Sequence, residues 1–308
     1  MARNIIVIGG GPAGVFAAIA AKKQAPDAEV VLLTEEHCEP YEKPPLSKAV
    51  LLGKVTAHDA PIAGPNGVAH HGVVLELKAR CVAIDRANHV VILEGGRHLP
   101  YDALVIATGA AAREIPQLPF GTPRVHYLRS EAHAQALKAE LVPGKHLLAI
   151  GGGLIGLEVA ASAAELGLKV TVLEMLPRIL ARVCDEETGA MVLAAHQAHG
   201  VDIRVGTGGA RATSEADGRI VAQTTAGDSI AADLVVVGAG ATADDRLATE
   251  CGLATDGGIV VDAQCRTSDP AIFAAGDVVR FPGPQGLVRL EDWRHAQDQG
   301  AVAGRNAA

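Results

Sequence analysis

Two glycine-rich turns carry the clearest chemical signal in the sequence. Both have the spacing G-x-G-x-x-G, the first over residues 9–14 and the second over 151–156. In such a turn the first glycine permits a tight bend, the second lets the backbone approach a pyrophosphate, and the third lets a helix pack closely on its strand. The phosphates bind at the helix N-terminus, where amides and the helix dipole favour anions. Each turn therefore predicts a dinucleotide site. The expected contacts are Gly9, Gly11, Pro12, Ala13 and Gly14 in the first turn, and Gly151, Gly153, Leu154, Ile155 and Gly156 in the second.

A carboxylate follows each turn by roughly 20 residues, the spacing at which dinucleotide folds bind ribose hydroxyls. In the first half this residue is Glu35 or Glu36, and the sequence leaves open which of the two binds and which is merely solvated. In the second half it is Glu174, and the two residues after it supply no cation. A carboxylate there repels a 2′-phosphate, which favours NAD over NADP, although Arg178 lies close enough to weaken that preference.

The segments around the turns predict two βαβ units. The first consists of a strand at 5–8, a helix at 15–24 and a strand at 29–33, and the second of a strand at 147–150, a helix at 157–166 and a strand at 169–173. Each is followed by a stretch of short predicted strands, over 73–99 and 209–237, and the chain closes with a predicted helix from about 293 to 306. The fold class is therefore α/β, with two Rossmann-like domains that each combine a central parallel sheet with a small antiparallel β-layer.

The domain boundaries follow from interruptions in this pattern. Glycine and proline break it near 110–122, and a return is expected near 236–245. We therefore expect one discontinuous domain, built from residues 1–112 and 239–308, that binds the first dinucleotide. The second dinucleotide-binding domain, residues 113–238, is inserted into it.

Composition excludes several other classes of function. The 308 residues are 49% hydrophobic and only 3% aromatic, and the formal net charge is −8. Nucleic-acid binding needs cations and stacking rings, so this balance disfavours it. The apolar run at 5–8 is too short for a signal-peptide core or a membrane span, and we expect a cytoplasmic protein.

Cysteine and histidine spacing predicts no metal site. None of the five cysteines forms a C-x-x-C pair, so neither a zinc knuckle nor a redox dithiol is indicated. His196 and His199 lie three residues apart, but no carboxylate or cysteine stands at ligand spacing beside them.

Three further motifs identify a family. Residues 41–48, Y-E-K-P-P-L-S-K, closely resemble the Y-x-R-P-P-L-S-K signature of the ferredoxin reductases that serve rubredoxin, putidaredoxin and aromatic-ring dioxygenase systems. These enzymes belong to the pyridine nucleotide–disulfide oxidoreductase superfamily, which has a glutathione-reductase-like fold. Residues 107–109 resemble its A-T-G turn, and 267–277, T-S-D-P-A-I-F-A-A-G-D, its second flavin motif. Residues 240–242, Asp262 and 291–299 also fit, so the resemblance spans nearly the whole chain.

The resemblance implies FAD in the N-terminal fold and NADH in the middle one. Hydride would pass from NADH to FAD, and electrons would then leave singly to ferredoxin or rubredoxin, in an oxygenase system. Lys48 would lie near the flavin N5 edge, paired with Glu158, which faces the nicotinamide. Arg113 would contact the FAD pyrophosphate, and Trp293 would either pack near the flavin or anchor the last helix. The other implied flavin contacts are Lys43, Pro45, Ala107, Thr108, Gly109, Gly276, Asp277 and Glu291, of which Asp277 would hold the ribityl chain.

Three departures from the family pattern limit this interpretation. Lys43 stands where the family usually has arginine. Lysine keeps the positive charge but lacks the bidentate fork of a guanidinium group. Cys38 lacks the partner found in disulfide-reducing relatives, so thiol reduction is not expected. Family members usually continue for one further small domain beyond the last residue here, and we expect that C-terminal interface domain to be absent.

Two alternatives stay open on the sequence. One is a reductase of a small acceptor such as a quinone. The other is a flavin-dependent, NADH-binding redox sensor of the apoptosis-inducing-factor type. The sequence does not decide between a monomer and a weak dimer.

Overall fold

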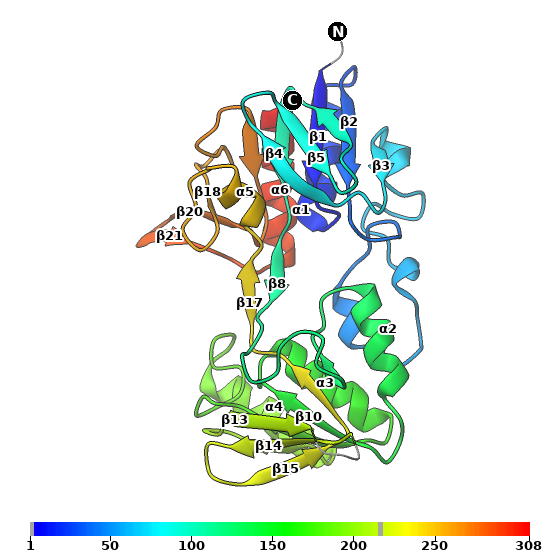
Figure 1. The fold of residues 1–308 in the computed structure, drawn as a ribbon, viewed down its shortest axis with the longest axis vertical. Coiled ribbons are helices and arrows are strands. Elements are labelled where there is room, and N and C mark those ends of the chain that lie inside the picture. Colours follow the sequence, from blue (N-terminus) through cyan, green and yellow to red (C-terminus); the bar gives the residue numbers. More distant parts are fainter. Residues whose placement is uncertain (1–2, 215–217) are drawn as a thin grey trace. The chain divides into compact units, whose positions relative to one another are not determined.

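The computed structural model describes residues 3–214 and 218–308, and the chain divides into two compact units (Figure 1). The first unit comprises Met1–Glu42, His58–Ala111 and Thr242–Ala308, and the second Lys43–Ala57 and Ala112–Ala241. Two short strands, β8 (Ala110–Ala112) and β17 (Ala241–Ala243), pair with each other where the chain passes between the units.

The first unit is built on a five-stranded parallel sheet with the order β19-β7-β1-β2-β3. Its members are β1 (Asn4–Ile8), β2 (Glu29–Leu33), β3 (Val74–Glu76), β7 (Ala103–Ile106) and β19 (Ile272–Ala274). The central strands are runs of valine, isoleucine and leucine with nearly every residue buried, as expected of a sheet covered on both faces.

Different elements cover the two faces of this sheet. Helices α1 (Pro12–Gln24) and α6 (Trp293–Ala307) pack with Ile5, Val7 and Val105 on one face. On the other face, Ile6 and Ile8 pack with the antiparallel strands β4 (Cys81–Asp85) and β5 (Val90–Leu93) and with α5 (Arg246–Glu250). The remaining elements are β6 (His98–Pro100), β18 (Ile259–Val260), β20 (Val279–Gly283), β21 (Gly286–Val288) and the 3-10 helices η2 (Ala57–Asp59) and η3 (Val68–His71).

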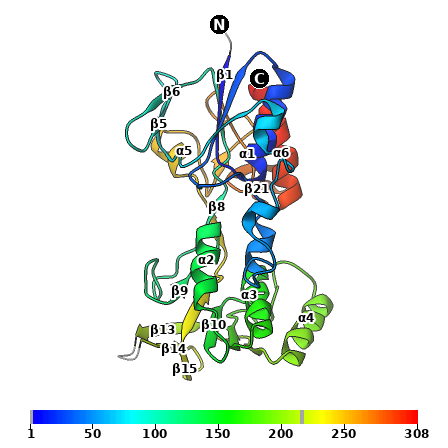
Figure 2. The same cartoon turned by 90° about the vertical axis from the view of Figure 1, so that its right-hand side faces the viewer.

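Helices α1 and α6 come from opposite ends of the sequence and lie side by side (Figure 2). Two glycines on α6 make this close packing possible. A Cβ added to Gly300 would lie 2.1 Å from the carbonyl oxygen of Ala13, and one added to Gly304 would lie 2.0 Å from that of Ala17. Since real Cβ atoms do not approach backbone atoms this closely, no larger residue fits at either position without moving the helices apart.

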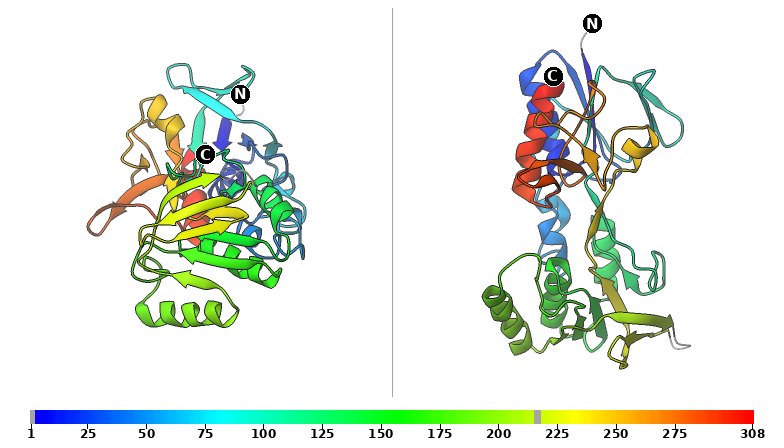
Figure 3. Two further views of the ribbon diagram at one scale, coloured as in Figure 1. Left: turned by 60° about the horizontal axis from the view of Figure 1, so that its bottom comes forward. Right: turned by 90° about the vertical axis from the view of Figure 1, so that its left-hand side faces the viewer.

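The second unit repeats the layered plan. Its parallel sheet has the order β12-β11-β10-β16-β9. The strands are β9 (Val125–His126), β10 (His146–Ile150), β11 (Lys169–Leu173), β12 (Asp202–Arg204) and β16 (Leu234–Val237). Helix α3 (Leu154–Glu165) packs on β10 and β11, and α4 (Glu186–Ala198), the light-green helix in Figure 3, contacts β12 at the sheet edge. The other helix of this unit is α2 (Glu131–Glu140).

An antiparallel sheet covers the remaining face of the second unit. It consists of β13 (Gly209–Ser214), β14 (Ile220–Thr224) and β15 (Ser229–Ala232). Ile220, Ala222 and Ile230 pack against Leu148 and Val235 of the parallel sheet. Both units therefore have the predicted combination of a parallel sheet and a small antiparallel layer, and the predicted fold class is confirmed.

The compact units differ from the expected domain boundaries mainly in one internal segment. Residues 43–57 lie in the second unit, whereas we expected the whole of 1–112 in the first. Residue 112 and residues 239–241 also lie in the second unit. The 3-10 helix η1 (Pro44–Ser47) packs on α2 and α3, and Leu46, Val50 and Leu51 are buried. The burial of these apolar side chains explains why 43–57 belongs to the second unit. Nothing in the local sequence pattern indicates this.

Helix α1 begins earlier than the predicted residue 15, because Pro12 occupies its first turn, where proline has no amide to leave unpaired. Among residues 3–214 and 218–308, no helix is both long and apolar enough to cross a membrane.

Candidate dinucleotide-binding sites

The first glycine turn has the geometry that its spacing predicts. Gly9 has a positive φ of +116°, and a Cβ on it would lie 2.2 Å from the carbonyl oxygen of Ala107. A Cβ on Gly14 would lie 1.8 Å from the carbonyl oxygen of Gly9. At Gly11, however, an added Cβ would meet no protein atom within 4 Å. The fold itself thus requires the first and third glycines, whereas the space at the second is open to a ligand.

The second turn repeats these features. Gly151 has a φ of +108°, and a Cβ on it would lie 2.4 Å from the carbonyl oxygen of Gly238. A Cβ on Gly156 would lie 2.0 Å from the carbonyl oxygen of Gly151, and the position at Gly153 is again open. The two helices that follow, α1 and α3, both begin without a side-chain cap. Their first amides can therefore bind an anion such as a pyrophosphate.

Glu174 is held in place by the backbone around the second turn. Its Oε2 accepts a hydrogen bond from the amide of Gly152 at 2.7 Å, and its Oε1 accepts one from the amide of Leu176 at 2.7 Å. These bonds fix the carboxylate beside the turn at the end of β11, where the ribose of a dinucleotide is bound.

The first unit places a different residue at that point. The Gly9 amide bonds to the Leu33 carbonyl at 2.8 Å, and the Gly151 amide bonds to the Leu173 carbonyl at the same distance. This match makes Thr34, not a glutamate, the equivalent of Glu174. The carboxylates of the first unit come one and two residues later.

The two candidate carboxylates of the first unit have different surroundings. Glu36 accepts a hydrogen bond from the buried Tyr41 hydroxyl at 2.5 Å, and its own amide donates to Thr34 Oγ1 at 3.3 Å. The Glu35 side chain is 71% exposed, with a long 3.7 Å contact to Arg80. Glu36 thus braces the loop after β2, while the Glu35 carboxylate is open to solvent.

Arg178 does not face a 2′-phosphate as a free cation. Its Nη1 donates to the Asp185 carbonyl at 3.3 Å and its Nη2 to the Ala181 carbonyl at 3.2 Å. The guanidinium therefore braces the loop before α4.

The signature segment brings four polar groups together within the second unit. Lys48 Nζ lies 2.8 Å from Glu158 Oε1, so the predicted pairing of these residues is present. The Ser47 hydroxyl donates to Glu158 Oε2, and the Ser162 hydroxyl donates to the Ser47 carbonyl at 2.8 Å. Glu158 and Ser162 are four residues apart and share one face of α3, so together they clamp Ser47 to that helix.

The neighbouring positions of the segment contribute through the backbone. The Pro45 carbonyl accepts hydrogen bonds from the Lys48 and Val50 amides at 3.0 Å. Lys43 Nζ makes a 3.4 Å contact with the Arg129 carbonyl oxygen. The backbone amide of Arg113 bonds to the Gly240 carbonyl at 2.9 Å, and its side chain is exposed.

The A-T-G turn is fixed within the first unit. The Thr108 hydroxyl donates to the Asp244 carbonyl at 2.7 Å, and Gly109, with a φ of +74°, accepts from the Asp244 amide at 3.0 Å. Ala107 packs directly over Gly9, so this turn lies against the first glycine turn.

The second flavin motif is also fixed within the first unit. Gly276 has a φ of +85°, and its amide donates to the side-chain oxygen of Gln299 at 2.8 Å. Arg289 donates to the Asp277 carbonyl at 3.1 Å and forms an ion pair with Glu291.

Trp293 anchors the start of α6. Its indole Nε1 donates to Glu42 Oε2 at 2.6 Å, and its ring is 40% exposed. Burial raises the pKa of the Glu42 carboxyl, and the hydrogen bond from Trp293 offsets part of this rise. Of the two roles considered for Trp293, this contact supports the anchoring one.

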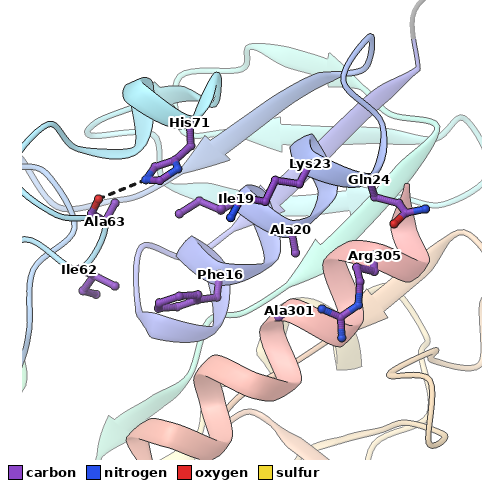
Figure 4. Close-up of a pocket in the computed structure, with 10 residues that line it drawn as sticks. All are labelled: Phe16, Ile19, Ala20, Lys23, Gln24, Ile62, Ala63, His71, Ala301 and Arg305. Carbon is purple, nitrogen blue, oxygen red and sulfur yellow. Dashed lines mark hydrogen bonds between the residues drawn. The ribbon is translucent and has the colours of Figure 1, made fainter.

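The first unit also has a pocket of about 400 Å³ that lies apart from its glycine turn (Figure 4). It lies between α1, the segment 62–71 and α6, and Figure 4 shows side chains from all three, among them the apolar Phe16 and Ile19 and the charged Lys23 and Arg305. Its lining includes no residue of the glycine turns or flavin motifs, so we assign no cofactor to it.

Comparison with known proteins places these features in one family. The family model for pyridine nucleotide-disulphide oxidoreductases matches residues 3–300. The chain belongs to this family. The predicted resemblance is confirmed, and with the family come its two cofactors, FAD and NAD. The two open turns at uncapped helix N-termini fit the two pyrophosphates.

Individual members of the family are similar over most of their length. The chain is 38% identical, over 295 residues, to the ferredoxin–NAD(+) reductase component of the p-cumate 2,3-dioxygenase system of Pseudomonas putida, covering 96% of this chain and 72% of that protein. It is 39% identical to the corresponding component of the anthranilate 1,2-dioxygenase system of Burkholderia cepacia, covering 98% of this chain and 74% of that protein. The crystal structure of a covalent putidaredoxin reductase–putidaredoxin complex matches with a TM-score of 0.92 and 34% identity, covering 99% of this chain and 75% of that chain.

Sequence reasoning gave no role to three side chains that organise these sites: Ser47, Ser162 and Gln299. Ser47 and Gln299 lay within stretches that fit the family and could have been found from them. Ser162 carried no signal, because its partner is distant in sequence.

Since Trp293 is the only tryptophan in the chain, its fluorescence reports on Glu42. We expect the emission to titrate with a midpoint above pH 4.5, the ordinary value for this carboxyl, because burial raises the pKa of Glu42. The folded state then holds the proton more tightly than the unfolded state, so the free energy of unfolding falls as pH rises through this interval. The measurement is tryptophan emission and chemical unfolding between about pH 4 and pH 8. Glu42→Gln should abolish the transition, and an unchanged transition in that variant would assign it to another group.

Proposed function

We propose that this chain is an NADH-dependent reductase that delivers electrons to an iron–sulfur protein, ferredoxin or rubredoxin, of an oxygenase system. One observation carries the proposal. The chain has two open glycine turns, one in each unit, and it is similar throughout to proteins named as ferredoxin–NAD(+) reductase components. The similarity to a reductase crystallised with putidaredoxin supports the same class of acceptor.

The first unit is assigned to FAD. The turn at 9–14 would bind its pyrophosphate. Glu35 would accept the ribose hydroxyls, because Glu36 is engaged by Tyr41. Asp277 would hold the ribityl chain. The further contacts assigned to FAD within this unit are Ala107, Thr108, Gly109, Gly276 and Glu291.

The second unit is assigned to NADH. The turn at 151–156 would bind its pyrophosphate, with the exposed apolar side chains of Leu154 and Ile155 at the start of α3. Glu174, fixed by two backbone amides, would accept both ribose hydroxyls and repel a 2′-phosphate. Because the Glu174 carboxylate is already fixed, it does not have to reorganise when the ribose binds. This favours NADH as the donor.

FAD, when bound, takes a hydride from NADH and releases electrons singly. Lys48 and Glu158 are the residues assigned to assist this reaction. The Lys48 ammonium would stabilise negative charge at the reacting rings. Glu158 holds the ammonium at 2.8 Å, and Ser47 holds the second oxygen of Glu158, so the cation is kept in one place. No nucleophile is needed, since positioning and electrostatics suffice.

The cysteines support a reducing location and no thiol chemistry. Cys81, Cys184, Cys251 and Cys265 are free thiols, and Cys38 is buried. Free thiols are typical of a reducing compartment, so we place the reaction in the cytoplasm.

The proposal is tested by a visible spectrum of the purified protein, followed by anaerobic addition of NADH and then of a 2Fe–2S ferredoxin. We expect a flavin spectrum that bleaches with NADH and recovers as the ferredoxin is reduced. A stable long-wavelength band that no iron–sulfur protein discharges would contradict the proposal and favour the redox sensor. Recovery with a quinone but not with ferredoxin or rubredoxin would favour the small-acceptor reductase.

Lys48→Ala should slow reduction of the flavin by NADH by about tenfold to a hundredfold, because it removes a preorganised charge. Stopped-flow absorbance under anaerobic conditions measures this rate. Lys54→Ala is the matched control, since Lys54 lies on the same segment in an exposed ion pair with Glu165. Equal rates for Lys48→Ala and Lys54→Ala would remove Lys48 from the mechanism.

Replacing Glu174→Ala together with Met175→Arg should raise the ratio of kcat/KM for NADPH to that for NADH by about tenfold to a hundredfold. The change removes a repelling charge and adds a charge-assisted phosphate contact. Met175→Arg alone is the control and should shift the ratio less, because Glu174 still repels the phosphate. If both variants keep the wild-type ratio, Glu174 does not discriminate between the two donors.

A further inference from the structure

A buried amide side chain connects the two flavin motifs of the first unit. Gln299 lies on α6 and is only 9% exposed. Its Oε1 accepts a hydrogen bond from the amide of Gly276 at 2.8 Å. Gly276 has a φ of +85°, so this bond fixes a backbone conformation that glycine adopts easily and other residues rarely do.

The same turn of α6 also contacts the first glycine turn. A Cβ on Gly300 would lie 2.1 Å from the carbonyl oxygen of Ala13. A Cβ on Gly276 would lie 2.7 Å from the Cβ of Ala13. Ala13, Gly276 and the Gln299–Gly300 pair are therefore in mutual contact, although they come from both ends of the chain.

This contact sets the spacing of two groups that act on one ligand. The helix N-terminal amides beyond Gly11 bind phosphate, and the carboxylate of Asp277 follows Gly276 directly. Without the Gln299 acceptor, the Gly276 amide would be left without a hydrogen bond, and this would raise the free energy of the present conformation of the turn. The turn could then relax, and Asp277 would move relative to α1.

We propose that Gln299 is a positioning residue for FAD: it holds the Gly276–Asp277 turn against the N-terminus of α1, so that both bind one cofactor molecule. This inference rests on the proposed assignment of FAD to the first unit. It adds a residue that does not itself touch the cofactor but decides how tightly the two motifs bind it together.

The test is the Kd of flavin-free protein for FAD, measured by quenching of FAD fluorescence. Gln299→Met keeps the length of the side chain and removes the acceptor, and we expect the Kd to rise about tenfold or more. Gln297→Met is the matched control, since Gln297 lies two residues away on α6 and points in another direction. Its Kd should equal that of the wild type.

Gln299→Glu tests rescue at about pH 6. A carboxyl oxygen at this position can accept the same hydrogen bond from the Gly276 amide. We expect a Kd within about threefold of the wild type, given the retained acceptor. If Gln299→Met does not fold, Gln299→Leu replaces it: a tenfold rise in the Kd, restored by Gln299→Glu, supports the proposal, and a wild-type Kd contradicts it.

If Gln299 only stabilises the fold, the measurements on Gln299→Met give a different result. If Gln299→Met lowers the unfolding temperature but binds FAD with the wild-type Kd, Gln299 only packs the core and the proposal is wrong. If the wild-type protein itself does not bind FAD, the proposed function fails instead, so the two failures are distinguishable.

Discussion

A pyrophosphate can approach a helix N-terminus only where the backbone carries no side chains, and much of this structure serves that requirement. At Gly9 and Gly151 the chain turns with a positive φ against a neighbouring carbonyl, and at Gly14 and Gly156 the helix lies within contact of the turn itself. The strand that leads into each turn has a buried centre. At Gly11 and Gly153, in contrast, no protein atom would meet an added Cβ, so packing does not account for a glycine there. Close approach of a pyrophosphate would account for it.

The two units use the same backbone but differ at the ends of their second strands. In the second unit a carboxylate stands directly after the strand and is held by two amides. In the first unit a threonine takes that place, and the exposed carboxylate comes one residue later. The same backbone turn therefore presents different surroundings to two related ligands, because the side chains beside it differ.

Local patterns predicted what depends on neighbours in sequence. The glycine spacing and the strand-sized apolar runs agree with the structure. The pairing of Lys48 with Glu158 joins residues distant in sequence, and it was implied by the family resemblance rather than by any local pattern. Other contacts between distant segments were not predictable. The assignment of 43–57 to the second unit depends on apolar burial against α2 and α3, and the choice between Glu35 and Glu36 depends on the Tyr41 hydroxyl. Ser162 bonds to a backbone group far away in the chain, and no local pattern marks that bond. Gln299 lies within a stretch that fits the family, but the resemblance does not say which backbone group it binds.

The packing of α6 on α1 also sets an order of assembly during synthesis. Residues 4–24 provide the first strand and helix early, and one face of that helix packs against α6, which spans Trp293–Ala307. The second unit, by contrast, is complete once residue 241 has been made. Since domains fold as their segments leave the ribosome, the inserted unit can fold before α6 has been made. Until then, the face of α1 that packs against α6 stays uncovered.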